Sequence, residues 1–175
     1  MNNVIGKLTI EQVNKLDQRE FVAFLGGVFE SSPWVAEASW FNRPFGSVTE
    51  LHTAMCDVVQ SAGSPQQEAL ICAHPDLVGR AALAGTLTPA SMREQASAGL
   101  DRLTLEEVSK FEELNRAYRG RFGFPFVICV RENKKEAILS GFSTRLTNSR
   151  EAEVEKALEE IAKIARLRLE ELIEQ

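Results

Sequence analysis

The sequence predicts an all-α protein, and three observations support this prediction. Signals for the start of a helix recur along the chain, apolar residues in the last segment follow helical spacing, and only one short apolar run resembles a strand. We expect a single compact multi-helix domain over residues 1–175, because single domains commonly contain roughly 100–200 residues.

Helix starts are marked by a capping residue that is followed three positions later by an acidic or amide side chain. This spacing allows two side chains to satisfy backbone N–H groups of the first turn reciprocally. It occurs at Thr9–Gln12, Asp17–Glu20, Ser47–Glu50, Ser64–Gln67, Thr104–Glu107 and Asn148–Glu151. Together with prolines after Ser32, Ser64 and Thr88, it predicts helices over 10–16, 18–30, 33–41, 48–61, 65–73, 89–98, 105–120, 134–147 and 149–173.

Two segments do not follow a helical pattern. An irregular loop is expected at 74–87, where Pro75, Gly79 and Gly85 interrupt the chain. The apolar run at 122–130 contains Pro125, which cannot donate to a sheet ladder, and no convincing partner strand is present. We therefore expect an extended apolar strap at 122–130 rather than a strand.

Composition excludes several classes of protein. Hydrophobic residues make up 44% and charged residues 26%, as in ordinary globular proteins, and the net charge is −5. An acidic chain is poorly suited to bind nucleic acid or an anionic membrane, and no apolar run approaches the ~20 residues of a membrane span. Three widely spaced cysteines and the lack of a signal-peptide pattern predict reduced thiols and a cytoplasmic location.

One arginine lies on the apolar face of the last predicted helix. Arg168 continues a stripe formed by Val154, Ala157, Leu158, Ile161, Ala165 and Leu172. A guanidinium on a core-facing stripe is costly unless it is paired. Arg168 therefore either snorkels or pairs with a buried glutamate of another helix, or it binds a group that is not protein, such as a substrate carboxylate.

His74 is placed where a helix should end. Pro75 disfavours helical backbone for the residue before it, so we expect the imidazole in a loop. A loop histidine that faces a cleft is suited to acid–base chemistry. The alternative is a histidine that caps the end of the preceding helix.

Three polar residues share one face of the predicted helix 89–98. Ser91, Glu94 and Gln95 have i, i+3 and i+4 spacing, and together they offer a hydroxyl, a carboxylate and a carboxamide to a small polar ring. The alternative is that Ser91 and Glu94 form a capping box.

Other candidate sites are weaker. His52 and Cys56 are spaced for a metal, but two ligands do not make a zinc site, so we expect no metal there. Cys72 and His74 suggest a thiol nucleophile with its base, yet no third group orients them. Asn115 lies on an apolar stripe and is interpreted as a structural buried polar group.

Several motifs, taken together, resemble one family. They are His74-Pro75-Asp76-Leu77-Val78-Gly79-Arg80, Gly85-Thr86-Leu87-Thr88, Ser91-x-x-Glu94-Gln95, Ala98-Gly99-Leu100, Leu114-Asn115-x-x-Tyr118, Arg121 to Ile128, Arg145-Leu146-x-Asn148 and Ile164 to Leu169. The combination resembles the OHCU decarboxylases, which act on 2-oxo-4-hydroxy-4-carboxy-5-ureidoimidazoline in urate breakdown. Trp40 to Phe45 also fits this family.

The resemblance implies an all-helical, usually dimeric and cofactor-free enzyme that releases (S)-allantoin. It implies catalytic roles for His74, Glu94 and Arg168, with His74 as acid or base. It further implies that the substrate is bound by Pro75, Ser91, Gln95 and backbone groups of Phe126, Val127, Ile128, Cys129 and Val130. No metal is implied, and the sequence leaves open which proton transfer His74 performs.

Two other functions remain as alternatives. The same helical scaffold could bind a protein or small ligand without catalysis, and such a protein would expose an apolar patch. A cysteine-dependent hydrolase that uses Cys72 would lose activity on alkylation.

Overall fold

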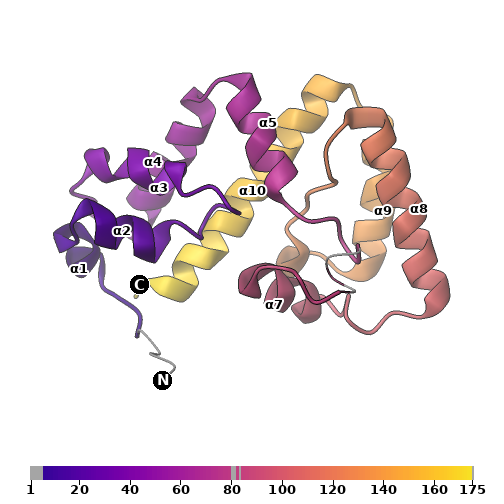
Figure 1. The fold of residues 1–175 in the computed structure, drawn as a ribbon, viewed down its shortest axis with the longest axis horizontal. Helices are drawn as coiled ribbons and strands as arrows, with labels where there is room; N and C mark the ends of the chain where they lie inside the picture. The colour runs from indigo at the N-terminus through magenta and orange to yellow at the C-terminus, as the bar shows by residue number, and fades with distance from the viewer. Residues whose placement is uncertain (1–5, 80–81, 83, 175) are drawn as a thin grey trace. The chain divides into compact units, whose positions relative to one another are not determined.

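The computed structural model describes residues 6–79, 82 and 84–174, and it consists of helices joined by turns and extended segments (Figure 1). Among these residues there is no strand, and ladder pairing is limited to an isolated parallel bridge between Leu8 and Ile173. The all-α prediction is confirmed. None of the helices in the described part of the chain is long and apolar enough to span a membrane.

The chain divides into two compact units, one of residues 1–70 with 162–175 and one of residues 71–161. The single domain expected over 1–175 stays a prediction. Two helices, α5 (Ser64–Ala73) and α10 (Arg150–Leu172), contribute residues to both units.

The first unit contains four further helices and one 3-10 turn. They are α1 (Ile10–Lys15), α2 (Gln18–Leu25), α3 (Trp34–Ser39), η1 (Trp40–Asn42) and α4 (Val48–Ser61). Helix α3 packs against both α2 and α4. The predicted caps Thr9 and Asp17 form reciprocal capping boxes with Gln12 and Glu20, and Ser47 accepts a hydrogen bond from the Glu50 N–H.

Helix α2 ends earlier than the sequence pattern predicts. It stops at Leu25 rather than at residue 30, and Gly26 caps it. A side chain at Gly26 would approach the Val22 carbonyl oxygen to 2.5 Å and the Pro33 Cβ to 3.3 Å, so this position favours glycine. The apolar pattern continues beyond this point, since Val28 and Phe29 are buried in the turns that follow. The prediction that Gly26 lies inside a helix is therefore wrong, and the glycine instead marks a close approach to Pro33.

The second unit contains helices α7 (Pro89–Ser97), α8 (Leu105–Phe122) and α9 (Lys135–Arg145), the 3-10 turn η2 (Val130–Glu132) and the first half of α10. Helix α8 packs against α9 (Figure 1). Helix α7 packs against η2. The irregular loop predicted at 74–87 is confirmed over 74–79 and 84–87, Ala82 is helical, and residues 80, 81 and 83 lie outside the described residues.

The strap predicted at 122–130 is confirmed over 125–129, because Phe122 belongs to α8 and Val130 to η2, and its aromatic side chain lies at the centre of the second unit. Helix α8 continues to Phe122 and ends at Gly123, whose φ of +84° is a left-handed conformation that glycine adopts readily. Residues 125–129 are extended and belong to no strand. Phe126 stacks on Phe142 of α9 at 3.8 Å between ring centroids and meets Tyr118 of α8 edge-on at 5.2 Å. Aromatic burial therefore contributes to holding this segment, which takes part in no sheet pairing.

Two predicted caps are wrong. Ser64 is the first residue of α5 rather than the residue before it, and α10 begins at Arg150 after Ser149. The Ser149 hydroxyl accepts a hydrogen bond from the Ala152 N–H, whereas the Asn148 side chain donates to Glu153 at 2.7 Å. A capping-type residue that can reach a buried carboxylate gains a charge-assisted hydrogen bond, which explains why Asn148 is used there instead.

Candidate active site

His74 lies directly after α5, where the chain leaves helical geometry. Its backbone N–H donates to the Ile71 carbonyl oxygen at 3.1 Å, and its side chain is buried, including the Nε2 atom. Pro75 follows it in a half-buried position. The structure therefore places a buried imidazole at the start of a loop, as predicted, which is a suitable position for a group that exchanges protons with a bound ligand.

The predicted polar face of α7 is its inner face. Ser91 and Gln95 are buried and Glu94 is half-buried, whereas Arg93 is exposed. The helix is capped by Thr88, whose hydroxyl accepts a hydrogen bond from the Ser91 N–H at 3.3 Å. Ser91 is thus inside the helix, and the interpretation of Ser91 and Glu94 as a capping box is wrong.

Gln95 links α7 to the loop that follows His74. Its Oε1 accepts a hydrogen bond from the Val78 N–H at 3.1 Å in a buried setting. This contact fixes the orientation of the Gln95 carboxamide relative to the loop. Because α7 also packs against η2, which follows the strap directly, the second unit brings together the His74 loop, the α7 face and the end of the strap.

Buried side chains of α9 and α10 bond to two backbone groups of the strap. The Val127 carbonyl oxygen accepts a hydrogen bond from Arg145 Nη1 at 2.6 Å, and the Cys129 N–H donates to Glu160 Oε2 at 2.8 Å. These two groups are therefore used inside the protein. Of the predicted strap residues Phe126, Val127, Ile128, Cys129 and Val130, only Ile128 is not fully buried. The Cys129 carbonyl oxygen also accepts from Asn133 Nδ2 at 2.9 Å, and the Val130 carbonyl oxygen accepts from the Asn133 N–H at 3.2 Å. Substrate binding by backbone groups of the strap stays a prediction.

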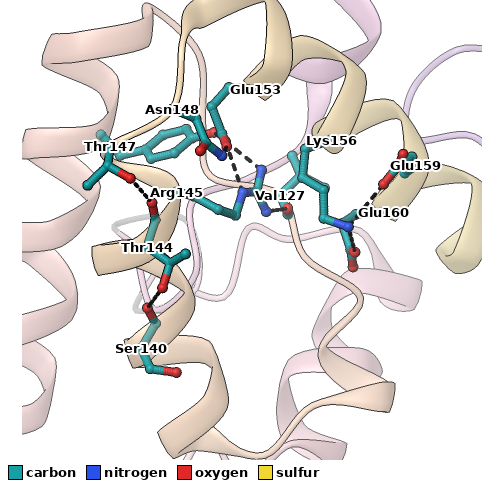
Figure 2. A network of polar contacts seen from close by, with 11 residues as sticks. Val127, Ser140, Thr144, Arg145, Thr147, Asn148, Glu153, Lys156, Glu159 and Glu160 are labelled. Atoms are coloured by element: carbon teal, nitrogen blue, oxygen red, sulfur yellow. Dashed lines mark hydrogen bonds and ion pairs between the residues drawn. The ribbon is translucent and has the colours of Figure 1, made fainter.

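A buried network of charged and polar side chains supports the strap (Figure 2). Arg145 forms an ion pair with Glu153 at 2.9 Å, and the Asn148 amide donates to the other oxygen of the same carboxylate at 2.7 Å. The Tyr118 hydroxyl donates to Glu153 and accepts from Arg145. Burial is the main cause of a raised pKa of Tyr118, and the hydrogen bond to Glu153 raises it further. The hydroxyl therefore stays protonated and remains a donor.

Sequence reasoning missed Glu153 and Glu160 as structural residues. Both are almost fully buried on α10, and Lys156 lies 3.4 Å from Glu160 (Figure 2). Their spacing to Ala157, at i−4 and i+3, places them on the apolar side of the helix. Glutamates at helical spacing from apolar residues are the signal that could have identified them. The same argument identified Arg168, because a charged residue on an apolar stripe needs a buried partner.

Arg168 belongs to the first unit, where it has a buried protein partner. Its Nη2 lies 2.8 Å from Glu30 Oε2, and the two side chains are only 5% and 3% exposed. Its Nη1 also lies 3.4 Å from the carbonyl oxygens of Gly27 and Val28. The reading in which Arg168 pairs with a buried glutamate fits this geometry, although Glu30 stands in a turn and not in a helix. Sequence reasoning missed Glu30 because it lies 138 positions before Arg168 in the chain, and periodicity within one helix does not identify such a partner.

The remaining candidates form no metal site. His52 Nε2 lies 2.8 Å from the Ala162 carbonyl oxygen and 3.4 Å from Cys56 Sγ. Within the part of the chain that the structure describes, no three His, Cys, Asp or Glu side chains are grouped as metal ligands.

The three thiols differ in exposure, which gives a test of the cysteine alternative. Burial raises the pKa of Cys56 to about 11 and also raises that of Cys129, so both are protonated at pH 8, whereas Cys72 is exposed. Iodoacetamide at pH 8 should therefore label Cys72 first, as measured by peptide mass spectrometry. We expect catalytic activity to survive this labelling, and a loss of activity in proportion to Cys72 modification would instead support a cysteine nucleophile.

Comparison with known proteins decides the family. A sequence model of the OHCU decarboxylase family matches residues 14–170. The chain belongs to the OHCU decarboxylase family. It is 45% identical over 165 residues to a 2-oxo-4-hydroxy-4-carboxy-5-ureidoimidazoline decarboxylase of Haloferax volcanii, covering 94% of this chain and 96% of that protein. It is 43% identical over 166 residues to the enzyme of the same name from Halalkalicoccus jeotgali, covering 95% and 92% of the two chains.

The fold of this OHCU decarboxylase family member also resembles a solved structure. The fold matches a crystal structure of (S)-allantoin synthase with a TM-score of 0.77 and 32% identity, over 95% of this chain. The chain spans about half of that protein's length, 54%. The family resemblance inferred from the motifs is thereby confirmed.

Proposed function

We propose that this chain decarboxylates 2-oxo-4-hydroxy-4-carboxy-5-ureidoimidazoline and forms (S)-allantoin in urate degradation. The proposal rests on how side chains are arranged in the second unit of this chain, which belongs to the OHCU decarboxylase family. A buried loop histidine, His74, is tied through Val78 and Gln95 to a helix face that presents a hydroxyl, a carboxylate and a carboxamide.

The reaction suits such a set of side chains. The carboxylate leaves from ring carbon 4, and the neighbouring carbon 5 is unsaturated, so the electron pair of the broken bond passes into the ring. The pair forms a bond between carbons 4 and 5, and the nitrogen that was doubly bonded to carbon 5 takes up a proton. The hydroxyl at carbon 4 then loses its proton to become a carbonyl while carbon 5 takes up a proton, so one net proton is consumed for each CO2 released. The substrate's own unsaturation accepts the electrons, which is why we propose a cofactor-independent reaction.

Stereoselectivity requires that the proton reach one face of the ring only. A fixed ring and a fixed acid achieve this, and they also remove much of the entropic cost of proton transfer. We assign the proton transfer to His74 and the holding of the ring to Ser91, Glu94, Gln95 and Pro75. The apolar strap beside α7 provides a setting of low polarity, which favours the conversion of a charged carboxylate into neutral CO2.

Arg168 is proposed to bind a polar or anionic part of the substrate, and its pairing with Glu30 sharpens the test. Arg168→Lys keeps the charge opposite Glu30 but loses the planar fork. We expect kcat/KM to fall by about 10- to 100-fold, the equivalent of one hydrogen bond to a charged group. Arg166→Lys, on the same helix and paired with Glu170, is the matched control and should retain activity. Full activity of Arg168→Lys would assign this arginine to the fold alone.

The proposal is tested by supplying the unstable substrate in place. Urate is converted by urate oxidase and 5-hydroxyisourate hydrolase, and the decay of the ureidoimidazoline is followed with and without this protein. Saturable acceleration that chelators leave unchanged supports cofactor-independent decarboxylation. Decay at the uncatalysed rate would move the non-catalytic binding function to first place.

The homodimer and the cytoplasmic location expected from the sequence are part of the same proposal. Sedimentation of the purified protein tests the first, and cell fractionation tests the second.

A further inference from the structure

The loop after His74 contains a backbone conformation that needs support. Val78 has a φ of +53°, a region that β-branched residues rarely occupy, and it is buried. The turn is closed by a hydrogen bond from the Gly79 N–H to the Asp76 carbonyl oxygen at 3.3 Å. It is also tight, because a side chain at Gly79 would approach the Asp76 Cβ to 2.8 Å. Such a turn persists only where surrounding contacts determine it.

Side chains of two helices contact three consecutive residues of this turn. Arg119 Nε lies 2.8 and 3.0 Å from the two carboxylate oxygens of Asp76. Asn115 Nδ2 donates to the Leu77 carbonyl oxygen at 2.8 Å, and both groups are buried. The third contact is the hydrogen bond from the Val78 N–H to Gln95, described above.

Asn115 provides the central of the three contacts to this turn, and it is more buried than Arg119. It is 6% exposed and lies one helical turn before Arg119, so the two side chains project from the same face of α8. A buried amide on an otherwise apolar stripe is costly unless it gains hydrogen bonds. Its bond to Leu77 satisfies the amide donor, whereas Asn115 Oδ1 is buried without a hydrogen-bond partner among the described residues. The amide therefore does not lower its own burial cost fully, and the bond holds the turn three residues after the imidazole.

We propose that Asn115 is a positioning residue for His74, and that Arg119 reinforces it through Asp76. This inference rests on the proposed function, because it assigns Asn115 a role in proton transfer at the same site. Asn115 itself does not touch the substrate. It acts by holding the strained turn. Along the backbone, Pro75 is the residue that links this turn to His74.

The first test replaces Asn115 by leucine, which is similar in size but has no donor. We expect kcat to fall by about 100-fold, the order of loss that a small misplacement of a reacting group produces, while KM stays within about twofold of wild type. A KM increase of the same size as the kcat loss would contradict positioning, because it would show loss of substrate binding instead.

A matched pair of exposed arginines keeps the test valid if Asn115→Leu does not fold. Arg119→Gln removes the contact to Asp76, and Arg116→Gln makes the same change on the exposed side of α8. Arg119→Gln should lower kcat by about two- to fivefold, as expected for a partly exposed ion pair, and Arg116→Gln should not lower it. Equal kcat values for the two variants would overturn the role of Arg119.

An activity-independent readout separates this inference from the proposed function. The chain has two histidines, so the imidazole Hε1 resonances can be assigned with His52→Gln. Asn115→Leu should shift or split the His74 resonance and leave that of His52, which lies in the other unit, in place. An unchanged His74 resonance overturns the inference even if the enzyme is active. A shifted resonance in a protein without decarboxylase activity would support positioning while the proposed function fails.

Discussion

His74→Ala is expected to lower kcat for decarboxylation by about 10²- to 10⁴-fold, the usual contribution of a general acid or base. The change removes the only titratable side chain that the structure buries at the start of this loop, among the described residues. The backbone hydrogen bond from residue 74 to Ile71 does not depend on the side chain, so the end of α5 should persist. Stopped assays with the substrate generated in place measure the loss.

His52→Ala is the control for this change. His52 lies in the first unit, and its ring bonds to the Ala162 carbonyl oxygen, so the variant should lose some thermal stability and keep its kcat. Comparable kcat values for His74→Ala and the wild-type protein would remove His74 from the mechanism, whatever the effect on stability.

Arg145→Met is expected to destabilise the protein by about 3–5 kcal/mol, because it leaves the Glu153 carboxylate buried without its cationic partner. Glu153 is 0% exposed and Arg145 is 6% exposed, so water cannot replace the lost contacts. The same change removes the donor to the Val127 carbonyl oxygen and thereby loosens the strap. Urea denaturation followed by far-ultraviolet circular dichroism gives the change in the free energy of unfolding.

The double variant Arg145→Met/Glu153→Leu separates charge burial from packing. Replacing both ions by apolar residues removes the uncompensated carboxylate, so a large part of the lost stability should return. A single variant that costs less than about 1 kcal/mol would mean that the network contributes no more than an exposed ion pair.

Local features of the fold were predictable where they depend on neighbouring residues. The capping boxes at Thr9, Asp17 and Thr104 need only a partner three positions away, and the structure contains all three. The end of α2 was not predictable in this way, because the segment after Gly26 stays apolar and buried although it consists of turns. Helical spacing of apolar residues does not distinguish a buried helix from buried turns such as those around Val28 and Phe29.

Long-range polar partners account for what sequence reasoning missed in the site. Periodicity identified Arg168 as a buried cation, but its partner Glu30 lies far away in the chain and inside a segment expected to be helical. Asn115 was recognised as a buried polar group, yet its role became clear only from its bond to the Leu77 carbonyl oxygen. The type and burial of a polar residue can be predicted from one sequence, whereas the atom it contacts depends on tertiary structure.

The most direct test of the central claim is the handedness of the product. The ureidoimidazoline is generated from urate in the presence of this protein, and circular dichroism is recorded in the allantoin bands. Rapid appearance of the (S)-allantoin signal, absent with His74→Ala, is the result that the proposed function predicts. Slow formation of optically inactive product, at the rate seen without protein, would contradict it.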